Sequence, residues 1–93
     1  MAAQDFGMTL ALQGLAWLAA DEDRILPFLA QSGLLASELR SRAGEPEVLA
    51  AVLDFLLSDE AMLLSFCGDL GLNPAEIAPA RAQLPGGDVP HWT

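Results

Sequence analysis

The stretch that decides the fold is residues 46–60, which read PEVLAAVLDFLLSDE. The only polar residue in Val48–Leu57 is Asp54, so this segment has no clear polar face. Pro46 suits the first turn of a helix, where its missing N–H needs no partner. A helix that is apolar on nearly all sides packs at the centre of a domain. We therefore predict a central helix from Pro46 to about Ser58.

A related pattern occurs once earlier in the chain. When the sequence is shifted by 38 residues, Leu15–Leu39 aligns with Leu53–Ile77, and 9 of the 25 pairs are identical. The identical pairs are Leu15/Leu53, Leu18/Leu56, Asp21/Asp59, Glu22/Glu60, Leu26/Leu64, Phe28/Phe66, Gly33/Gly71, Leu34/Leu72 and Glu38/Glu76. The matched acids and the matched glycine go beyond a shared richness in leucine. This spacing predicts two tandem units of an internal repeat, over about 8–43 and 46–83.

Each unit is expected to contain three helices. The predicted first helices are Met8–Ala20 and Pro46–Ser58, the second are Glu22–Gln31 and Glu60–Leu70, and the third are Ser37–Ala43 and a segment from Asn73 to about Gln83. Pro79 should kink that last helix, or restart it near Ala78. Two prolines and two glycines in 85–93 exclude a regular helix there, so these residues are expected to form a tail.

The fold class follows from these helices and from the composition. Leucine and alanine supply 34 of the 93 residues, and both favour helices. We predict an all-α, single compact domain of about six short helices. The two first helices should pack against each other, with the remaining helices outside them in a pseudo-twofold arrangement. If the outer helices cannot cover both, the surplus apolar face becomes a dimer interface or a groove for a partner.

The net charge of −9 comes from 13 acids and 4 arginines. Nine acids are expected in or just before a first helical turn, where a carboxylate favourably meets the positive end of the helix: Asp21, Glu22, Asp23, Glu38, Glu45, Glu47, Asp59, Glu60 and Glu76. Arg40, Arg42 and Arg81 are expected near the opposite ends of helices. Most of the charge is therefore explained by helix capping.

The same composition excludes several kinds of partner. Nucleic acid is disfavoured because phosphate binding needs clustered cations, and an anionic membrane surface is disfavoured for the same reason. No apolar run approaches the length of a membrane-spanning helix. The first residues lack the cationic start of a secretory signal, and a single cysteine agrees with a reducing compartment. We expect a cytoplasmic protein that binds no nucleic acid and no membrane.

Two acids do not fit the capping pattern. Asp54 is the lone acid of the central helix, and it either faces solvent, pairs with an arginine such as Arg24, or anchors a partner in a groove. Asp69 falls in the last turn of its helix, where an acid is mildly unfavourable, so we consider a contact role for it as well. Neither acid has a plausible acid or base partner in the sequence.

The remaining reactive side chains favour structural roles. Cys67 corresponds to Leu29 in the other unit, so a buried small hydrophobe is favoured over a reactive thiol. His91 is the single histidine and has no neighbouring ligand cluster. The acids Asp21–Asp23 lack the glycine and the spacing of a calcium loop. We expect no catalytic residue, cofactor or metal.

The two tryptophans differ in their surroundings. Trp17 matches Phe55 in the repeat and is expected in the core. Trp92 lies in the predicted tail, where it either folds back on the body or docks on a partner together with Pro90. The candidate partner contacts are therefore Asp54, Asp69, Pro90 and Trp92.

Several motifs resemble those of a known family. They are Leu15–Ala19 (LAWLA), Val52–Leu57 (VLDFLL) followed by Asp59 and Glu60, and the ending that runs from Leu84–Gly87 (LPGG) to Trp92. Together they resemble DUF3572, a family of short α-proteobacterial proteins of unknown function. The resemblance implies a small cytoplasmic helical protein and brings no catalytic residues. It also points to a bacterial signalling protein as a partner.

Three functions stay open at this stage. The leading hypothesis is a non-catalytic protein–protein interaction or regulatory module, which binds a partner or itself as a homodimer. The alternative is an acidic decoy or inhibitor of a basic nucleic-acid-binding protein. A small-molecule site or an enzyme would need a concave pocket with converging polar groups, which the sequence does not indicate.

Overall fold

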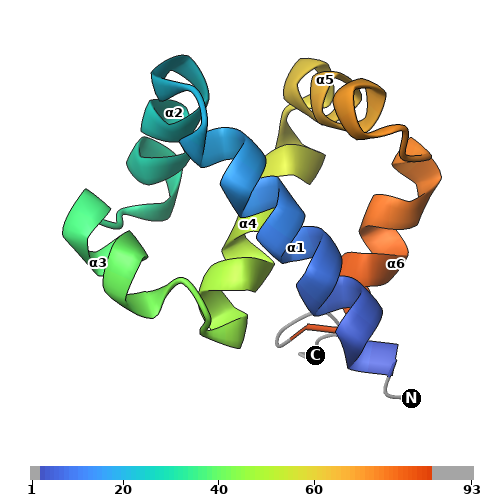
Figure 1. Ribbon diagram of the computed structural model, residues 1–93, viewed down its shortest axis with the longest axis horizontal. Helices are drawn as coiled ribbons and strands as arrows, with labels where there is room; N and C mark the ends of the chain where they lie inside the picture. The colour runs from blue at the N-terminus through green and yellow to red at the C-terminus, as the bar shows by residue number, and fades with distance from the viewer. Residues whose placement is uncertain (1–2, 85–93) are drawn as a thin grey trace, which may run out of the picture.

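The computed structural model describes residues 3–84, with side chains described from Phe6 onward. These residues form the helices α1 (Ala3–Ala19), α2 (Glu22–Ser32), α3 (Ala36–Arg42), α4 (Pro46–Ser58), α5 (Glu60–Leu70) and α6 (Ile77–Ala82), with a short 3-10 helix, η1 (Pro74–Glu76), before α6 (Figure 1). No strand occurs within this described range, so the predicted all-α class is confirmed. The radius of gyration is 12.6 Å, against about 12.3 Å for one compact domain of this length.

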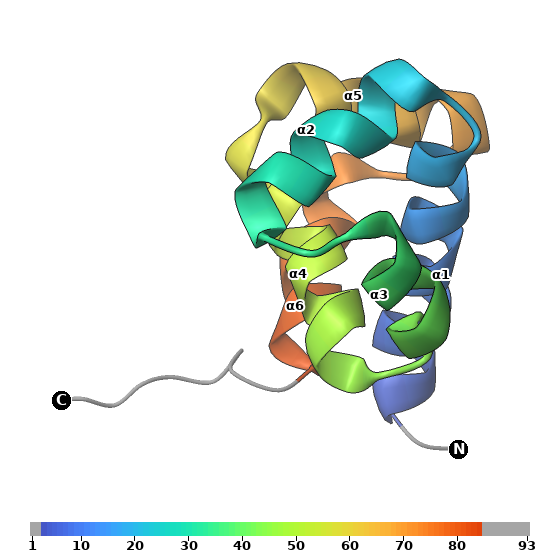
Figure 2. The same cartoon turned by 90° about the vertical axis from the view of Figure 1, so that its left-hand side faces the viewer.

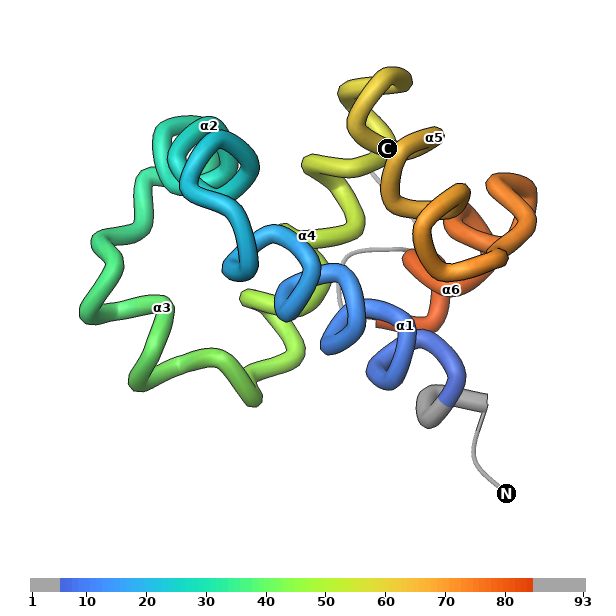
Figure 3. Tube along the Cα trace, turned by 45° about the horizontal axis from the view of Figure 1, so that its top comes forward, coloured from blue at the N-terminus to red at the C-terminus, as the bar shows by residue number. Residues whose placement is uncertain are grey.

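The first helices of the two predicted units, α1 and α4, pack against each other as expected. Both run toward the end of the molecule that α2 and α5 cover, while α3 and α6 lie on opposite sides of the central pair (Figures 1 and 3). Helix α6 packs against both central helices. None of the described helices is long and apolar enough to cross a membrane.

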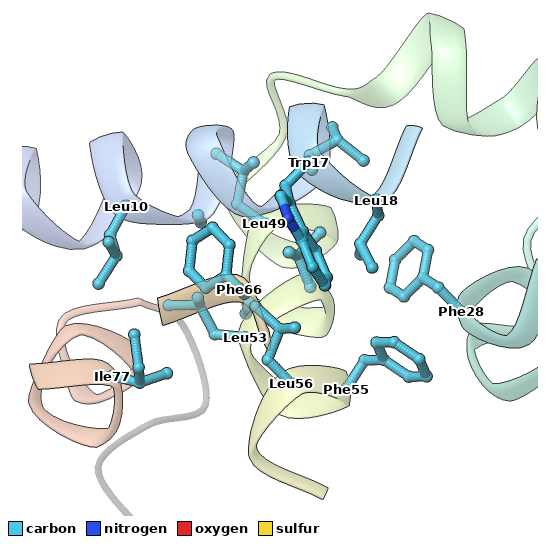
Figure 4. Close-up of a cluster of buried hydrophobic side chains, with 14 of the residues drawn as sticks. Leu10, Trp17, Leu18, Phe28, Leu49, Leu53, Phe55, Leu56, Phe66 and Ile77 are labelled. Atoms are coloured by element: carbon cyan, nitrogen blue, oxygen red, sulfur yellow. The ribbon is translucent and has the colours of Figure 1, made fainter. Parts of the chain in front are cut away.

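The core is centred on α4. This helix buries seven residues, namely Val48, Leu49, Ala50, Val52, Leu53, Phe55 and Leu56. Two edge-to-face aromatic pairs join the halves of the chain: the ring centroids of Trp17 and Phe66 are 5.5 Å apart, and those of Phe28 and Phe55 are 5.7 Å apart (Figure 4). No described polar or charged residue is buried. Apolar burial therefore dominates the interior.

The ends of α2 and α5 follow the capping signals in the sequence. The carboxylate of Asp21 accepts the backbone N–H of Asp23 at 2.9 Å, and that of Asp59 accepts the backbone N–H of Met62 at 3.1 Å. Both helices end at a glycine in the left-handed conformation, with φ values of 79° and 70°. All nine acids assigned to helix starts lie there, and the arginines of α3 and α6 lie in last turns. The capping interpretation of the charge is confirmed.

The start of the first helix differs from the prediction. Helix α1 begins at Ala3 instead of Met8 and continues through Gly7. Gly7 contacts the end of α6, because its N–H donates to the Gln83 side chain at 2.8 Å. The predicted restart of the last helix near Ala78 is confirmed, since η1 ends at Glu76 and α6 begins at Ile77. Pro79 then lies in the first turn of α6, where the missing N–H costs little.

The two halves agree in part. The bounds of α2 and α5 differ by 38 residues at both ends, and so do their caps. The third segments differ, because α3 is one helix that buries only Leu39, whereas its counterpart is split into η1 and α6. The internal repeat therefore stays a prediction. The predicted tail, residues 85–93, lies outside the described residues.

Candidate functional site

A polar cluster surrounds Trp17 at the end of α1. The indole N–H of Trp17 donates to the Asp69 carboxylate of α5 at 2.7 Å. The Arg24 guanidinium of α2 lies 4.0 Å from the centroid of the Trp17 ring, and it donates to the Trp17 carbonyl oxygen at 3.1 Å. Arg24 also lies 3.7 Å from Asp69. We call Trp17, Arg24 and Asp69 the Trp17 cluster; it ties three helices together.

The cluster explains the unfavourable position of Asp69. An acid in the last turn of a helix faces the negative end of the helix dipole. Trp17 is only 8% exposed, so its N–H needs an acceptor, and Asp69 supplies one. Asp69, which was considered for a contact role, therefore contacts Trp17 and Arg24 of its own chain.

Asp54 forms a second link, between α4 and α6. The Arg81 Nε and Nη2 atoms donate to its two carboxylate oxygens at 2.6 and 3.2 Å. The Arg81 side chain is 16% exposed and the Asp54 side chain is 52% exposed. A bidentate pair of this kind fixes both side chains. Asp54 thus faces solvent and also pairs with an arginine, as two of the three alternatives predicted. The arginine is Arg81 and not Arg24, the example given, because Arg24 is held at Trp17.

The other two candidate contacts, Pro90 and Trp92, lie outside the described residues, as does His91. Among the described residues, Cys67 is buried in α5. Burial raises the pKa of its thiol, and the charge of Glu76 raises it further. The predicted burial of this small side chain is confirmed. Within the range that the structure describes, no group of three or more potential metal ligands occurs.

An open hollow of about 270 Å³ lies beside α4. Its lining residues are Ser32, Leu34, Arg42, Glu47, Val48 and Ala51. Two of its polar lining residues are already engaged: the Ser32 hydroxyl contacts the backbone of Leu29 and Leu34, and Arg42 pairs with Glu45 at 2.8 Å. That pairing raises the pKa of Arg42. This hollow offers few uncommitted polar groups to a small molecule.

The surface carries several large apolar side chains that are more than one third exposed. They are Phe6, Leu12, Leu26, Leu35, Leu57, Leu64 and Leu70. Two of them belong to α1, whose exposed residues are Phe6, Thr9, Leu12, Gln13, Ala16 and Ala19. We call these six residues the α1 outer face. None of these six residues is charged, and α1 contains one acid, Asp5, outside the range of described side chains.

The sequence indicated only part of these features. It predicted a surplus apolar face beside the central helices, and α1 does expose one. It did not indicate the Trp17 cluster, because the three residues are brought together only by the packing of α1, α2 and α5. The one available signal was the unexplained acid at the end of α5.

Comparison with known proteins identifies a family. A family model described as "Protein of unknown function (DUF3572)" matches residues 4–87. No curated protein and no solved structure matches the chain significantly. The matched range contains α4, all of α1 except Ala3, the Trp17 cluster and the α1 outer face. The chain belongs to the DUF3572 family.

Proposed function

We propose that this protein is a non-catalytic protein–protein interaction or regulatory module that acts in the cytoplasm. It binds a partner protein, such as a bacterial signalling protein, or a second copy of itself. The observation that carries this proposal is the set of seven large apolar side chains that are each between 37% and 65% exposed. Isolated exposed leucines are common. Seven on such a small helical body give a partner several apolar anchors.

The engagement of the polar candidates also supports a non-catalytic role. Asp54 is held by Arg81, and Asp69 is held by Trp17 and Arg24. A general acid or base must instead present its carboxyl group to a substrate. Both acids therefore act as links between helices, and the apolar surface is left as the feature that a partner can recognise.

A test is affinity purification of the full chain from its native host, followed by mass spectrometry. Leu26→Glu and Leu64→Glu each place a charge on an exposed apolar position, and Ser65→Glu adds the same charge beside Leu64. We expect at least one leucine variant to lose a partner that Ser65→Glu retains. If nothing co-purifies and the protein stays monomeric at every concentration, the proposal is wrong.

A second candidate function is the acidic decoy for a basic nucleic-acid-binding protein. It is favoured by the exposed acids at helix starts, among them Glu22, Asp23 and Glu60. Binding through these acids should weaken as salt rises, because exposed charges are screened. If reversing their charge leaves binding to a basic partner unchanged, the decoy is excluded.

A further inference from the structure

Helix α3 is held on the molecule by few contacts. Leu39, which is 7% exposed, is its one buried residue. None of the close packings between described helices involves α3. Two of its charged side chains bond only a few residues along the chain: Glu38 accepts the N–H of Leu35, and Arg42 donates to Glu45. Leu39 is therefore the main link between α3 and the core.

The corresponding place in the other half of the chain is filled differently. Helix α6, which follows α5 through η1, packs against both α1 and α4. It buries Ile77 and Ala80 completely, and Leu84, which follows it, is only 4% exposed. Figure 2 looks onto the α3 side of the molecule and shows α3 at the surface. On this side, one short helix with one buried residue covers the core.

The ends of α3 do little to stabilise it as a helix. It has seven residues, and isolated helices shorter than about 12 residues are marginal in water. Leu35 before its first turn has no side-chain oxygen to cap it, and Ala43 after its last turn has the ordinary right-handed conformation. In α2 and α5, in contrast, a carboxylate caps the start and a left-handed glycine forms the end. Helix α3 therefore depends on the docking of Leu39.

We propose that residues 35–42 form a flap that opens while the rest of the fold stays intact. Leu34 and Ala43, on either side of the flap, are half-buried against the core, so opening is confined to the residues between them. A segment with few buried contacts opens at a lower free energy than the whole chain unfolds. The inference goes beyond the proposed interaction function and does not depend on it.

Opening of the flap changes the surface beside α4. The open hollow is lined in part by Arg42 of the flap and by the apolar residues Leu34, Val48 and Ala51. Val48 is only 2% exposed while the flap is closed. Opening withdraws Leu39 from the core and Arg42 from the rim of the hollow, so the apolar lining becomes more accessible. The protein thus has an apolar surface that is covered in one state and accessible in the other.

Native-state hydrogen exchange of the full chain, followed by NMR at low urea concentrations, tests the flap. The N–H of Leu39, which donates to the Leu35 carbonyl oxygen at 2.9 Å, reports on α3, and the amides of α4 report on the whole fold. We expect the α3 amides to exchange at least about a hundredfold faster than the most protected α4 amides. Their exchange should also depend little on urea, because opening exposes little surface. A common rate and a common urea dependence in α3 and α4 overturn the inference.

Leu39→Ala removes the buried residue of the flap. We expect the α3 amides to lose their protection in this variant, while the amides of α4 and α5 stay protected. If α3 keeps its protection, or loses it only together with α4, the inference is wrong.

Ile77→Ala is the matched control, because Ile77 aligns with Leu39 when the sequence is shifted by 38 residues. Ile77 stays buried whether the flap is open or closed, so its loss destabilises both states equally. We expect the α4 amides to exchange about thirtyfold faster or more, and the α3 amides to change by less than about twofold. Ile77→Val gives the same pattern at a smaller size if Ile77→Ala does not fold. Equal acceleration of α3 and α4 in these variants overturns the inference.

Discussion

The Trp17 cluster gives a sharp prediction for stability. Asp69→Ala removes the acceptor of the Trp17 indole N–H, which is bonded at 2.7 Å and belongs to a residue that is 8% exposed. It also removes the ion pair between Asp69 and Arg24. We expect the free energy of unfolding to fall.

The magnitude follows from three contributions. A hydrogen bond to a charged acceptor is worth about 1.5–3 kcal/mol, and the low end applies because the Asp69 side chain is 55% exposed. The ion pair with Arg24, at 3.7 Å between half-exposed groups, adds at most about 0.5 kcal/mol. Replacing an acid by alanine in the last turn of α5 raises the free energy of unfolding by about 0.5–1 kcal/mol, which offsets part of this loss. The net loss is about 0.5–1.5 kcal/mol, or about 2–12 °C in Tm.

Urea unfolding followed by far-UV circular dichroism measures this loss, and Asp69→Asn is the matched control. Asparagine keeps an oxygen that can accept the indole N–H but carries no charge. It also relieves the unfavourable helix end, so we expect Asp69→Asn to lie within about 0.5 kcal/mol of the original chain. If Asp69→Ala is as stable as Asp69→Asn, the hydrogen bond to Trp17 contributes nothing and the reasoning is refuted.

Two more predictions concern glycines and the buried thiol. A Cβ at Gly7 would lie 2.6 Å from the Ala80 carbonyl oxygen, whereas a Cβ at Gly68 would meet nothing within 4 Å. Gly7→Ala should therefore destabilise the fold by about 1–3 kcal/mol and Gly68→Ala should stabilise it by about 0.5–1 kcal/mol in the same urea assay; the opposite order would contradict the close approach of α1 and α6. Burial raises the pKa of Cys67 above its ordinary value of 9.0, so the folded state holds this proton more tightly than the unfolded state. The free energy of unfolding should therefore decrease as the pH rises above 9.0, and Cys67→Ala should reduce this decrease. Urea unfolding of both proteins at increasing pH measures it; the same pH dependence in both would exclude the thiol as the cause.

Local signals in the sequence predicted much of the fold. Asp59 and Gly71 mark the two ends of α5 through their own backbone contacts, so its bounds could be predicted without knowledge of the packing. The bounds of α4 were also predicted correctly, because Pro46 starts it and the Asp59 signal follows it. Capping depends on neighbours along the chain, which a sequence displays directly.

Features that depend on packing were missed. The sequence left open whether Asp54 faces solvent, pairs with an arginine such as Arg24 or anchors a partner; it pairs with Arg81, 27 residues away, because α6 lies against α4. The start of α1 was placed at Met8, whereas the helix continues through Gly7, which contacts the end of α6. The exposure of Leu12 likewise depends on which helices cover α1, and periodicity alone does not decide that.

The contact between Gly7 and Gln83 has a consequence for the order of folding. The hydrogen bond joins residues 76 positions apart, so it closes almost the whole chain into one loop. Forming such a contact costs the conformational entropy of a long segment before the contact contributes any favourable free energy. The caps of α2 and α5, in contrast, form between residues close in sequence. We therefore expect the docking of α1 on α6 to be a late event in folding, absent from the rate-limiting step. A clash at Gly7 should accordingly speed unfolding and leave the rate of refolding nearly unchanged.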